Sequence, residues 1–319
     1  MDVRSPHATT ESPFEVLDRL APLVREQIAE AEAQRSLSPV VAQAMVDGGL
    51  LRLLTPASLG GGEIDPVGLY KVVEAAARID GSFGWCLMIL SGTGLLARAM
   101  SEHEALALLG DPTTVVAGAA FPFNKAVAVE GGYRVSGRWP FASGCLHATH
   151  LMGFSIVHDG DAPRMGPGGP DIRVRVAPAG DVEIVENWEV VGLQGTGSHD
   201  IVFDNVFVPE GRAVPLGDGK RNRYYEGALY RMPFMALFAW PVAAVALGIA
   251  QHSIDSAIEL SQEKVPAGAG SAVRLSNDLQ RCMRDLHAVS QHVVTGPATW
   301  EQAGVVLAGL PPINPMIML

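Results

Sequence analysis

The middle of this sequence changes its periodicity, and that change constrains the fold more than any other feature. From Thr113 to about Pro215 the chain runs through short apolar segments with a period near two, separated by Gly, Pro, Asp or Asn. The segments read TTVVAGAA, KAVAVE, YRVSGRW, HLMGFSIV, DIRVRVAP, DVEIVENW and DIVFDNVFVP. So many consecutive strands predict a small β-barrel or sandwich.

Helical periodicity flanks this block on both sides. The apolar residues spaced three and four apart near the start are Leu17, Leu20, Val24 and Ile28. The periodicity returns from Phe234 and includes the segment SNDLQRCMRDLHAVSQHVV. We predict an α+β fold with an N-terminal helical domain over 1–111, a central β-barrel over 112–215 and a C-terminal helical bundle over 216–319.

Several helix boundaries are readable within the first segment. Ser38 followed by Pro39 predicts an N-cap and first helical residue, and Gly48 with Gly49 predicts the end of that helix. After a turn-rich loop, TPASLGGGEIDP, two more apolar helices are expected over about 67–79 and 82–99.

One apolar stretch, Met232 to Ala250, is close to the length of a membrane span. It contains Pro241 and continues into QHSIDSAIELSQEKV, where Ile254 and Ile258 prolong the apolar stripe at helical spacing. We favour a buried central helix, with a membrane span as the alternative.

Composition narrows the class of partner. The chain has 319 residues, 48% hydrophobic and 18% charged, and a mean hydropathy of +0.21, which predicts extra surface buried in a homodimer or homotetramer. A net charge of −11 without a basic run argues against nucleic acid and against an anionic membrane. The start of the chain lacks the apolar core of a signal peptide, and the cysteines form no CxxC pair, so we expect a cytoplasmic location.

Familiar catalytic motifs fail on inspection. GTGSHD, Gly195 to Asp200, lacks the third glycine of a dinucleotide fingerprint and precedes a strand. Ser143 lacks the flanking glycines of a hydrolase nucleophile elbow. His147 and His150 have no further ligand at metal-binding spacing, so no metal site is expected.

Four separated blocks carry a family resemblance. They are DGSFGWC (80–86), GGYRVSGRWPFASG (131–144), NWEVVGLQGTGSHDIVFDNVFVPEGR (187–212) and LQRCMRDLHAVSQHVVTGPATWEQAG (279–304). In this order they resemble the acyl-CoA dehydrogenase superfamily, and within it the oxygenase components of two-component aromatic hydroxylases. The resemblance implies the fold predicted above. It also implies that a separate NAD(P)H-dependent reductase supplies reduced FMN or FAD, which reacts with O2 to a C4a-hydroperoxide that hydroxylates an aromatic, phenolic or polycyclic small molecule.

The resemblance also implies where a flavin binds. The segment with Trp139, Phe141 and Ser143 is expected to lie against the isoalloxazine ring, with Ser143 hydrogen-bonded near N5. A water-excluding aromatic wall with one fixed hydroxyl suits a reactive oxygen adduct. The alternative interpretation is that Trp139 and Phe141 are barrel core and Ser143 is a turn residue.

A second group of residues is expected around the same ring. His292 matches a histidine that faces flavin and substrate, and a neutral imidazole suits removal of a phenol proton. Trp85 and Asn124 are candidates for packing on or bonding to the ring, while Ser198 and His199 line either the flavin edge or a strand turn.

The flavin phosphate has its own candidate residues, Gly270, Ser271 and Arg274. Glycine permits close backbone approach, and arginine offers a bidentate phosphate contact. An ordinary solvated loop is the alternative for this segment.

The sequence departs from the family pattern in its C-terminal domain. Segments 259–268 and 270–281 are joined almost directly where the family has a pair of long helices between them, so we expect an internally shortened bundle near 268–270. This leaves two alternatives to a monooxygenase: an acyl-CoA dehydrogenase-type FAD oxidoreductase, and a non-catalytic homologue inactivated by loss of the two helices. The first is disfavoured because no convincing carboxylate base is found.

Overall fold

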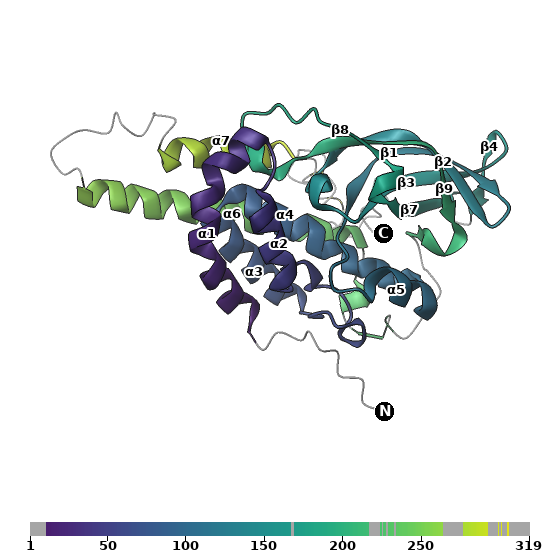
Figure 1. The fold of residues 1–319 in the computed structure, drawn as a ribbon, viewed down its shortest axis with the longest axis horizontal. Helices are drawn as coiled ribbons and strands as arrows, with labels where there is room; N and C mark the ends of the chain where they lie inside the picture. The colour runs from purple at the N-terminus through teal and green to yellow at the C-terminus, as the bar shows by residue number, and fades with distance from the viewer. Residues whose placement is uncertain are drawn as a thin grey trace.

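The computed structural model describes residues 11–166, 169–216, 234–263 and 277–292, with single residues and short pieces between 224 and 232 and between 299 and 305. Figure 1 shows the helices gathered at one end of the molecule and the β-sheet at the other. The order of helices, strands and helices agrees with the predicted fold class. The domain boundaries after residues 111 and 215 stay a prediction.

The N-terminal helices begin where side chains cap their free N–H groups. Ser12 and Glu15 form a capping box at the first helix, and the Asp65 carboxylate accepts from the backbone of Val67 and Gly68 at the third. Ser38 does occupy the N-cap position of the second helix, but its side chain makes no capping bond. The helices are α1 (Pro13–Gln34), α2 (Pro39–Asp47), α3 (Pro66–Ile79), α4 (Gly81–Gly92) and α5 (Glu102–Leu109).

The predicted helix over 82–99 is two elements, because α4 ends at Gly92 and a 3-10 helix continues over Thr93–Ala99. Among the residues described, the stretch Gly81–Ala99 is long and apolar enough to cross a membrane. Of its most apolar 18 residues, 89% are buried inside the protein. It is the core helix of the N-terminal half, with Phe83, Cys86 and Leu87 fully enclosed.

The central block forms a mixed sheet with the order β10-β7-β3-β1-β2-β9-β8, while β4 pairs with β3. β1 runs parallel to β3, and the other pairs are antiparallel. The strands are β1 (Val116–Val129), β2 (Gly132–Ala142), β3 (His150–Asp159), β4 (Ala162–Pro163), β7 (Ile172–Pro178), β8 (Glu183–Val185), β9 (His199–Pro209) and β10 (Ala213–Pro215), with a separate short pair β5 (Met165–Gly166) and β6 (Gly169–Pro170). This sheet is the predicted central β-unit, and among the described residues its end strands are β10 and β8.

The C-terminal region contributes α6 (Phe234–Glu263) and α7 (Asp278–Ser290). α6 packs against α3, α4 and α7, and the Gly248 backbone lies so close to the Glu74 carbonyl that a side chain would not fit. Its described buried residues Val242, Val245 and Ile249 face this core, so the part of the apolar stretch that lies in α6 belongs to a packed helix. The junction expected to be shortened lies outside the described residues.

Candidate functional site

A β-bulge at the end of β2 places the aromatic side chains of the GRWPFASG segment on different faces of the strand. The pairing of β2 with β9 shifts between Trp139 and Ala142, and Phe141 within the bulge has a φ of 65°. A bulge turns neighbouring side chains to different faces. As a result Phe141 is 67% exposed, whereas Ser143 is buried just beyond it.

Trp139 lies on the inner side of this bulge. Its side chain is 0% exposed, its indole Nε1 donates to the Phe154 carbonyl at 3.0 Å, and its ring covers Gly153. In this structure Trp139 is a core residue of β2, the strand that also carries Phe141, as the alternative interpretation held for this position.

Three hydroxyl groups form a buried chain behind Phe141, which we call the hydroxyl cluster: Ser143, Ser198 and Thr196. Ser143 Oγ lies 2.7 Å from Ser198 Oγ, and Ser198 Oγ lies 2.7 Å from Thr196 Oγ1. At one end Trp85 Nε1 donates to Ser143 Oγ at 3.0 Å; at the other, Thr196 Oγ1 donates to the Leu193 carbonyl at 2.9 Å. The fold thus brings together residues from α4, β2 and the segment before β9.

His292 joins the cluster through Trp85. The two ring centroids lie 5.3 Å apart at an interplanar angle of 68°, an edge-to-face contact. Burial lowers the pKa of His292 below its ordinary value of 6.5 because it disfavours the imidazolium. The imidazole is therefore neutral at pH 7, as a proton acceptor must be.

His199 is placed differently from its neighbour Ser198. Its Nδ1 accepts from the backbone N–H groups of Asn187 and Trp188, at 3.0 and 3.1 Å, so its proton sits on Nε2. Nε2 is buried and has no hydrogen-bond partner among the described residues, and burial lowers the pKa of this histidine. His199 therefore ties the start of β9 to the backbone at Trp188. The Trp188 ring meets the exposed Phe141 ring edge-to-face, with the ring centroids 6.0 Å apart.

The remaining predicted residues do not join this group. Asn124 Nδ2 donates to the Arg138 carbonyl at 2.9 Å, which ties β1 to β2 and is not a contact with the hydroxyl cluster. Gly270, Ser271 and Arg274 lie outside the described residues.

Sequence reasoning missed the residues that hold the cluster from behind. Leu193 has a left-handed φ of 54°, and its N–H donates to Asp285 Oδ1 on α7 at 2.7 Å. Asp285 is 3% exposed, and burial together with the charge of Asp80 raises its pKa to about 7. The only sequence signal for this segment was the motif GTGSH. No residue near Leu193 in the sequence indicated a contact with an aspartate 92 positions away.

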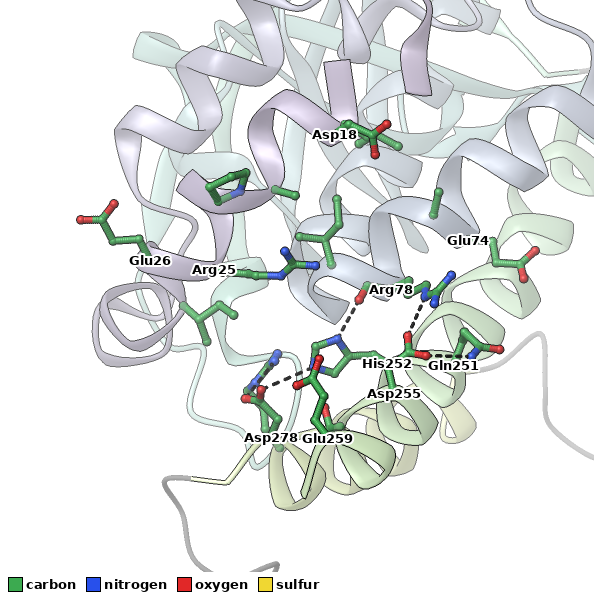
Figure 2. Close-up of a pocket in the computed structure, with 18 of the residues that line it drawn as sticks. Asp18, Arg25, Glu26, Glu74, Arg78, Gln251, His252, Asp255, Glu259 and Asp278 are labelled. Carbon is green, nitrogen blue, oxygen red and sulfur yellow. Dashed lines mark hydrogen bonds and ion pairs between the residues drawn. The ribbon is translucent and has the colours of Figure 1, made fainter. Parts of the chain in front are cut away.

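A large cavity lies elsewhere, in a groove of about 1440 Å³ between α1, α3, α6 and α7 (Figure 2), which we call the charged groove. Two contacts cross it: Arg78 pairs with Asp255 at 2.7 Å, and His252 lies 3.7 Å from Asp278. Its lining is charged rather than apolar, which does not suit a flat aromatic ligand.

Comparison with known proteins places the fold in a family. Residues 15–107 match the acyl-CoA dehydrogenase N-terminal domain. The chain is 33% identical to indole-3-acetate monooxygenase of Pseudomonas putida over 78% of this chain and 62% of the relative. It is 30% identical to HsaA of Rhodococcus jostii, the oxygenase subunit of a flavin-dependent monooxygenase, over 79% of this chain and 66% of the relative.

Two further similarities agree with these. The pigment production hydroxylase of Rhodococcus erythropolis is 31% identical over 82% of this chain and 68% of its own length. The structure of XiaF from Streptomyces sp. with FADH2 and glycerol superposes with a TM-score of 0.84 at 23% identity, covering 99% of this chain and 100% of that one. The chain spans less than two thirds of the first two relatives. It belongs to the acyl-CoA dehydrogenase superfamily, in the branch of flavin-dependent monooxygenase oxygenase components.

Proposed function

We propose that this protein is the oxygenase component of a two-component monooxygenase that uses reduced FMN or FAD and O2 to hydroxylate an aromatic or phenolic small molecule. The observation that carries the proposal is the grouping of Ser143, Trp85 and His292 behind the exposed Phe141 ring. The names of the relatives, a monooxygenase and an oxygenase subunit, support the same reaction class.

The described residues fit a planar heteroaromatic cofactor. Phe141 offers an exposed aromatic face, with Trp188 at right angles to it, and such faces bind flat rings. Ser143 Oγ has partners in Trp85 and Ser198 and keeps hydrogen-bonding capacity at its oxygen. Phosphate contacts through Gly270, Ser271 and Arg274 are a further part of this proposal.

The reduced flavin, when bound, supplies the activation of O2 and the transferred oxygen atom. The protein's part is to position and to move a proton. His292, neutral because burial lowers its pKa, takes the hydroxyl proton of a phenol and so raises the electron density of the ring to be attacked. Trp85 fixes the positions of both residues, since its ring contacts His292 and its Nε1–H donates to Ser143. The buried surroundings exclude water.

The proposal includes partners. A separate NAD(P)H-dependent reductase would deliver the reduced flavin, as "oxygenase subunit" in the name of a relative suggests.

A homo-oligomer is favoured because Trp240, Leu247 and Ile254 lie exposed at every seventh residue of α6, the spacing at which two helices pack. Sedimentation of the wild type against Leu247→Glu tests this. A cytoplasmic location is part of the same proposal.

The test is an anaerobic titration of the protein with chemically reduced FMN and FAD, followed by mixing with O2 and with simple phenols such as p-hydroxyphenylacetate. We expect saturable binding, flavin reoxidation slower than in free solution, and hydroxylated product. Ser143→Ala should speed reoxidation, whereas Ser136→Ala, an exposed serine earlier on β2, should not. No binding and immediate reoxidation would leave a non-catalytic homologue.

An acyl-CoA dehydrogenase reaction is less well supported. It needs an accessible carboxylate to remove an α-proton. Asp285 is the carboxylate with a pKa raised to about 7, but it is buried and bonded to the Leu193 N–H. Bleaching of bound oxidised FAD by an acyl-CoA would reverse this preference.

A further inference from the structure

The helix α7 is bound to both of the elements that carry the candidate site, and the first of these is α4. Arg281 binds the carboxylate of Asp80, which caps the start of α4 by accepting from the Phe83 N–H at 2.8 Å. Trp85 lies two residues further along the same helix. Both Asp80 and Arg281 are buried, so this ion pair joins α7 to α4 inside the protein.

The second element bound to α7 is the segment before β9, which leads to the hydroxyl cluster. Asp285 Oδ1 accepts from the Leu193 N–H at 2.7 Å, and Arg284 Nη1 donates to the Val191 carbonyl at 2.7 Å. Gly192, between them, lies so close to the Arg284 carbonyl that a side chain would not fit. Three consecutive residues of the segment therefore contact two consecutive residues of the helix.

These contacts close a ring around the candidate site. From Leu193 they run through the hydroxyl cluster to Trp85 Nε1, and from the Trp85 ring to His292. The His292 N–H donates to the Val289 carbonyl at 3.1 Å, in the last turn of α7, one turn after Asp285. The ring therefore returns to α7, and a movement of the segment away from this helix changes the position of the hydroxyl cluster relative to His292.

The bond from Leu193 to Asp285 has a particular importance in this ring. Leu193 has a left-handed φ of 54°, which a leucine keeps only where its surroundings hold it. Its carbonyl accepts from Trp188 Nε1 at 3.1 Å and from Thr196 Oγ1 at 2.9 Å. Loss of the Asp285 oxygen therefore releases the residue to which both the Trp188 ring and the hydroxyl cluster are bound.

We propose that Asp285 and Arg284 are positioning residues that hold His292 and the hydroxyl cluster at the separation that hydroxylation requires. The inference rests on the proposed function, in which His292 takes the proton of a phenol. Asp285 acts through the Leu193 N–H and Arg284 through the Val191 carbonyl. A displacement of about 1 Å can slow a catalysed step about 100-fold, because a general base must be within hydrogen-bond reach of the proton it removes.

The experiment compares Asp285→Ala and Asp285→Asn with the wild type in two measurements. The first is the hydroxylation of p-hydroxyphenylacetate with reduced FMN, recorded as kcat and as KM for the phenol. For Asp285→Ala we expect kcat to fall about 10-fold to 100-fold while KM stays within about 3-fold, because the groups are displaced and not removed. Asp285→Asn keeps an oxygen for the Leu193 N–H and should restore kcat to within about 3-fold of the wild type.

The second measurement needs no flavin and is an NMR titration of the His292 imidazole, assigned by comparison with His292→Gln. In the wild type, burial lowers the pKa of His292 below 6.5. In Asp285→Ala we expect the midpoint to lie closer to 6.5, because a displaced ring is more hydrated. Asp285→Asn should keep the wild-type midpoint. Both variants remove the same carboxylate charge, so a difference between them reports the position of His292.

Two further variants keep the test decisive. Val73→Ala, a change of a buried residue on α3 outside the ring, should lower the melting temperature and leave kcat and the His292 midpoint unchanged. Arg284→Met removes the bond to the Val191 carbonyl and replaces Asp285→Ala if that variant does not fold. It should change both measurements in the same direction.

Wild-type kcat together with a wild-type His292 midpoint in the folded variant would overturn the inference. A wild type that hydroxylates no phenol would instead contradict the proposed function. In that case the His292 midpoint in Asp285→Ala still decides whether Asp285 positions this residue.

Discussion

The hydroxyl cluster behind Phe141 and the charged groove beside α6 are both built from polar side chains, and they differ in charge. In the groove Arg78 pairs with Asp255, and further charged side chains such as Arg25 line the same cavity. In the cluster neutral hydroxyl groups bind one another in a buried chain between Trp85 Nε1 and the Leu193 carbonyl.

This difference teaches that cavity size alone does not mark the site. The groove is large, but its lining is charged, with side chains of both signs. The cluster has neutral hydroxyl groups beside the aromatic rings of Trp85 and His292, which suits a flat cofactor. The kind of side chain, not the volume, distinguishes the two regions.

The largest expected effect is a loss of hydroxylation rate when the region of the hydroxyl cluster is changed at His292. Replacing His292 by Gln removes the neutral imidazole beside Trp85, and general-base catalysis is worth about 10²-fold to 10⁴-fold in rate. We expect hydroxylation of a phenol to fall by that factor while the affinity for reduced FMN stays within a few fold. In the wild type, the rate should rise with pH through a midpoint below 6.5, because burial lowers the pKa of His292.

His287→Gln is the matched control, because His287 is exposed on the adjoining helix α7. It should leave the rate unchanged. An equal loss in both variants would show that the region needs only an intact helix end, and would remove His292 from the proposed mechanism.

How far the sequence could predict these regions depends on the distance over which each contact acts. The strands and most helices followed from local periodicity, and the family resemblance brought Ser143, Trp85, Ser198 and His292 to one place. The sequence pattern does not separate Trp139 from Phe141, because a one-residue bulge between them changes which face each side chain takes.

Long-range partners were beyond the pattern altogether. Nothing near Leu193 indicates that an aspartate on α7 accepts its N–H, and nothing near Asp80 indicates that Arg281 binds it at 2.5 Å. Such contacts depend on how separate elements pack, which local propensity does not encode. The order of the strands within the sheet depends on the same packing, since the number of strands alone does not give it.

The next expected effect is a loss of stability when a buried ion pair of the charged groove is removed. Arg281 is 6% exposed and binds Asp80, with Asp285 at 3.9 Å. Arg281→Met leaves two buried carboxylates without their cation, so we expect the free energy of unfolding to drop by about 3–5 kcal/mol. Urea denaturation measures it.

Arg78→Ala provides the contrast on the same groove. Its pair with Asp255 is 55% and 33% exposed, and exposed pairs contribute less than about 1 kcal/mol. A similar loss in both variants would mean that the groove is uniformly structural, and the distinction drawn between its buried and its exposed pairs would have to be abandoned.

A gradual effect of pH is expected where the two regions meet, at Asp285, which binds Leu193 of the cluster segment and faces Arg281 of the groove. Its pKa rises from 3.8 to about 7 on folding, so between these values the native protein holds a proton that the unfolded chain has released. Stability therefore decreases as pH rises from about 4 to about 7 and is constant above, by at most about 4 kcal/mol for this group.

Asp285→Asn removes that titration and keeps an oxygen for the Leu193 N–H. Unfolding free energies of the two proteins, measured from pH 4 to pH 8, should differ by an amount that moves in favour of the variant as pH rises and then levels near pH 7. A constant difference would mean that Asp285 keeps its charge throughout. In that case Leu193 is held by a carboxylate, and the hydroxyl cluster is anchored to the ion pairs of the groove at every pH.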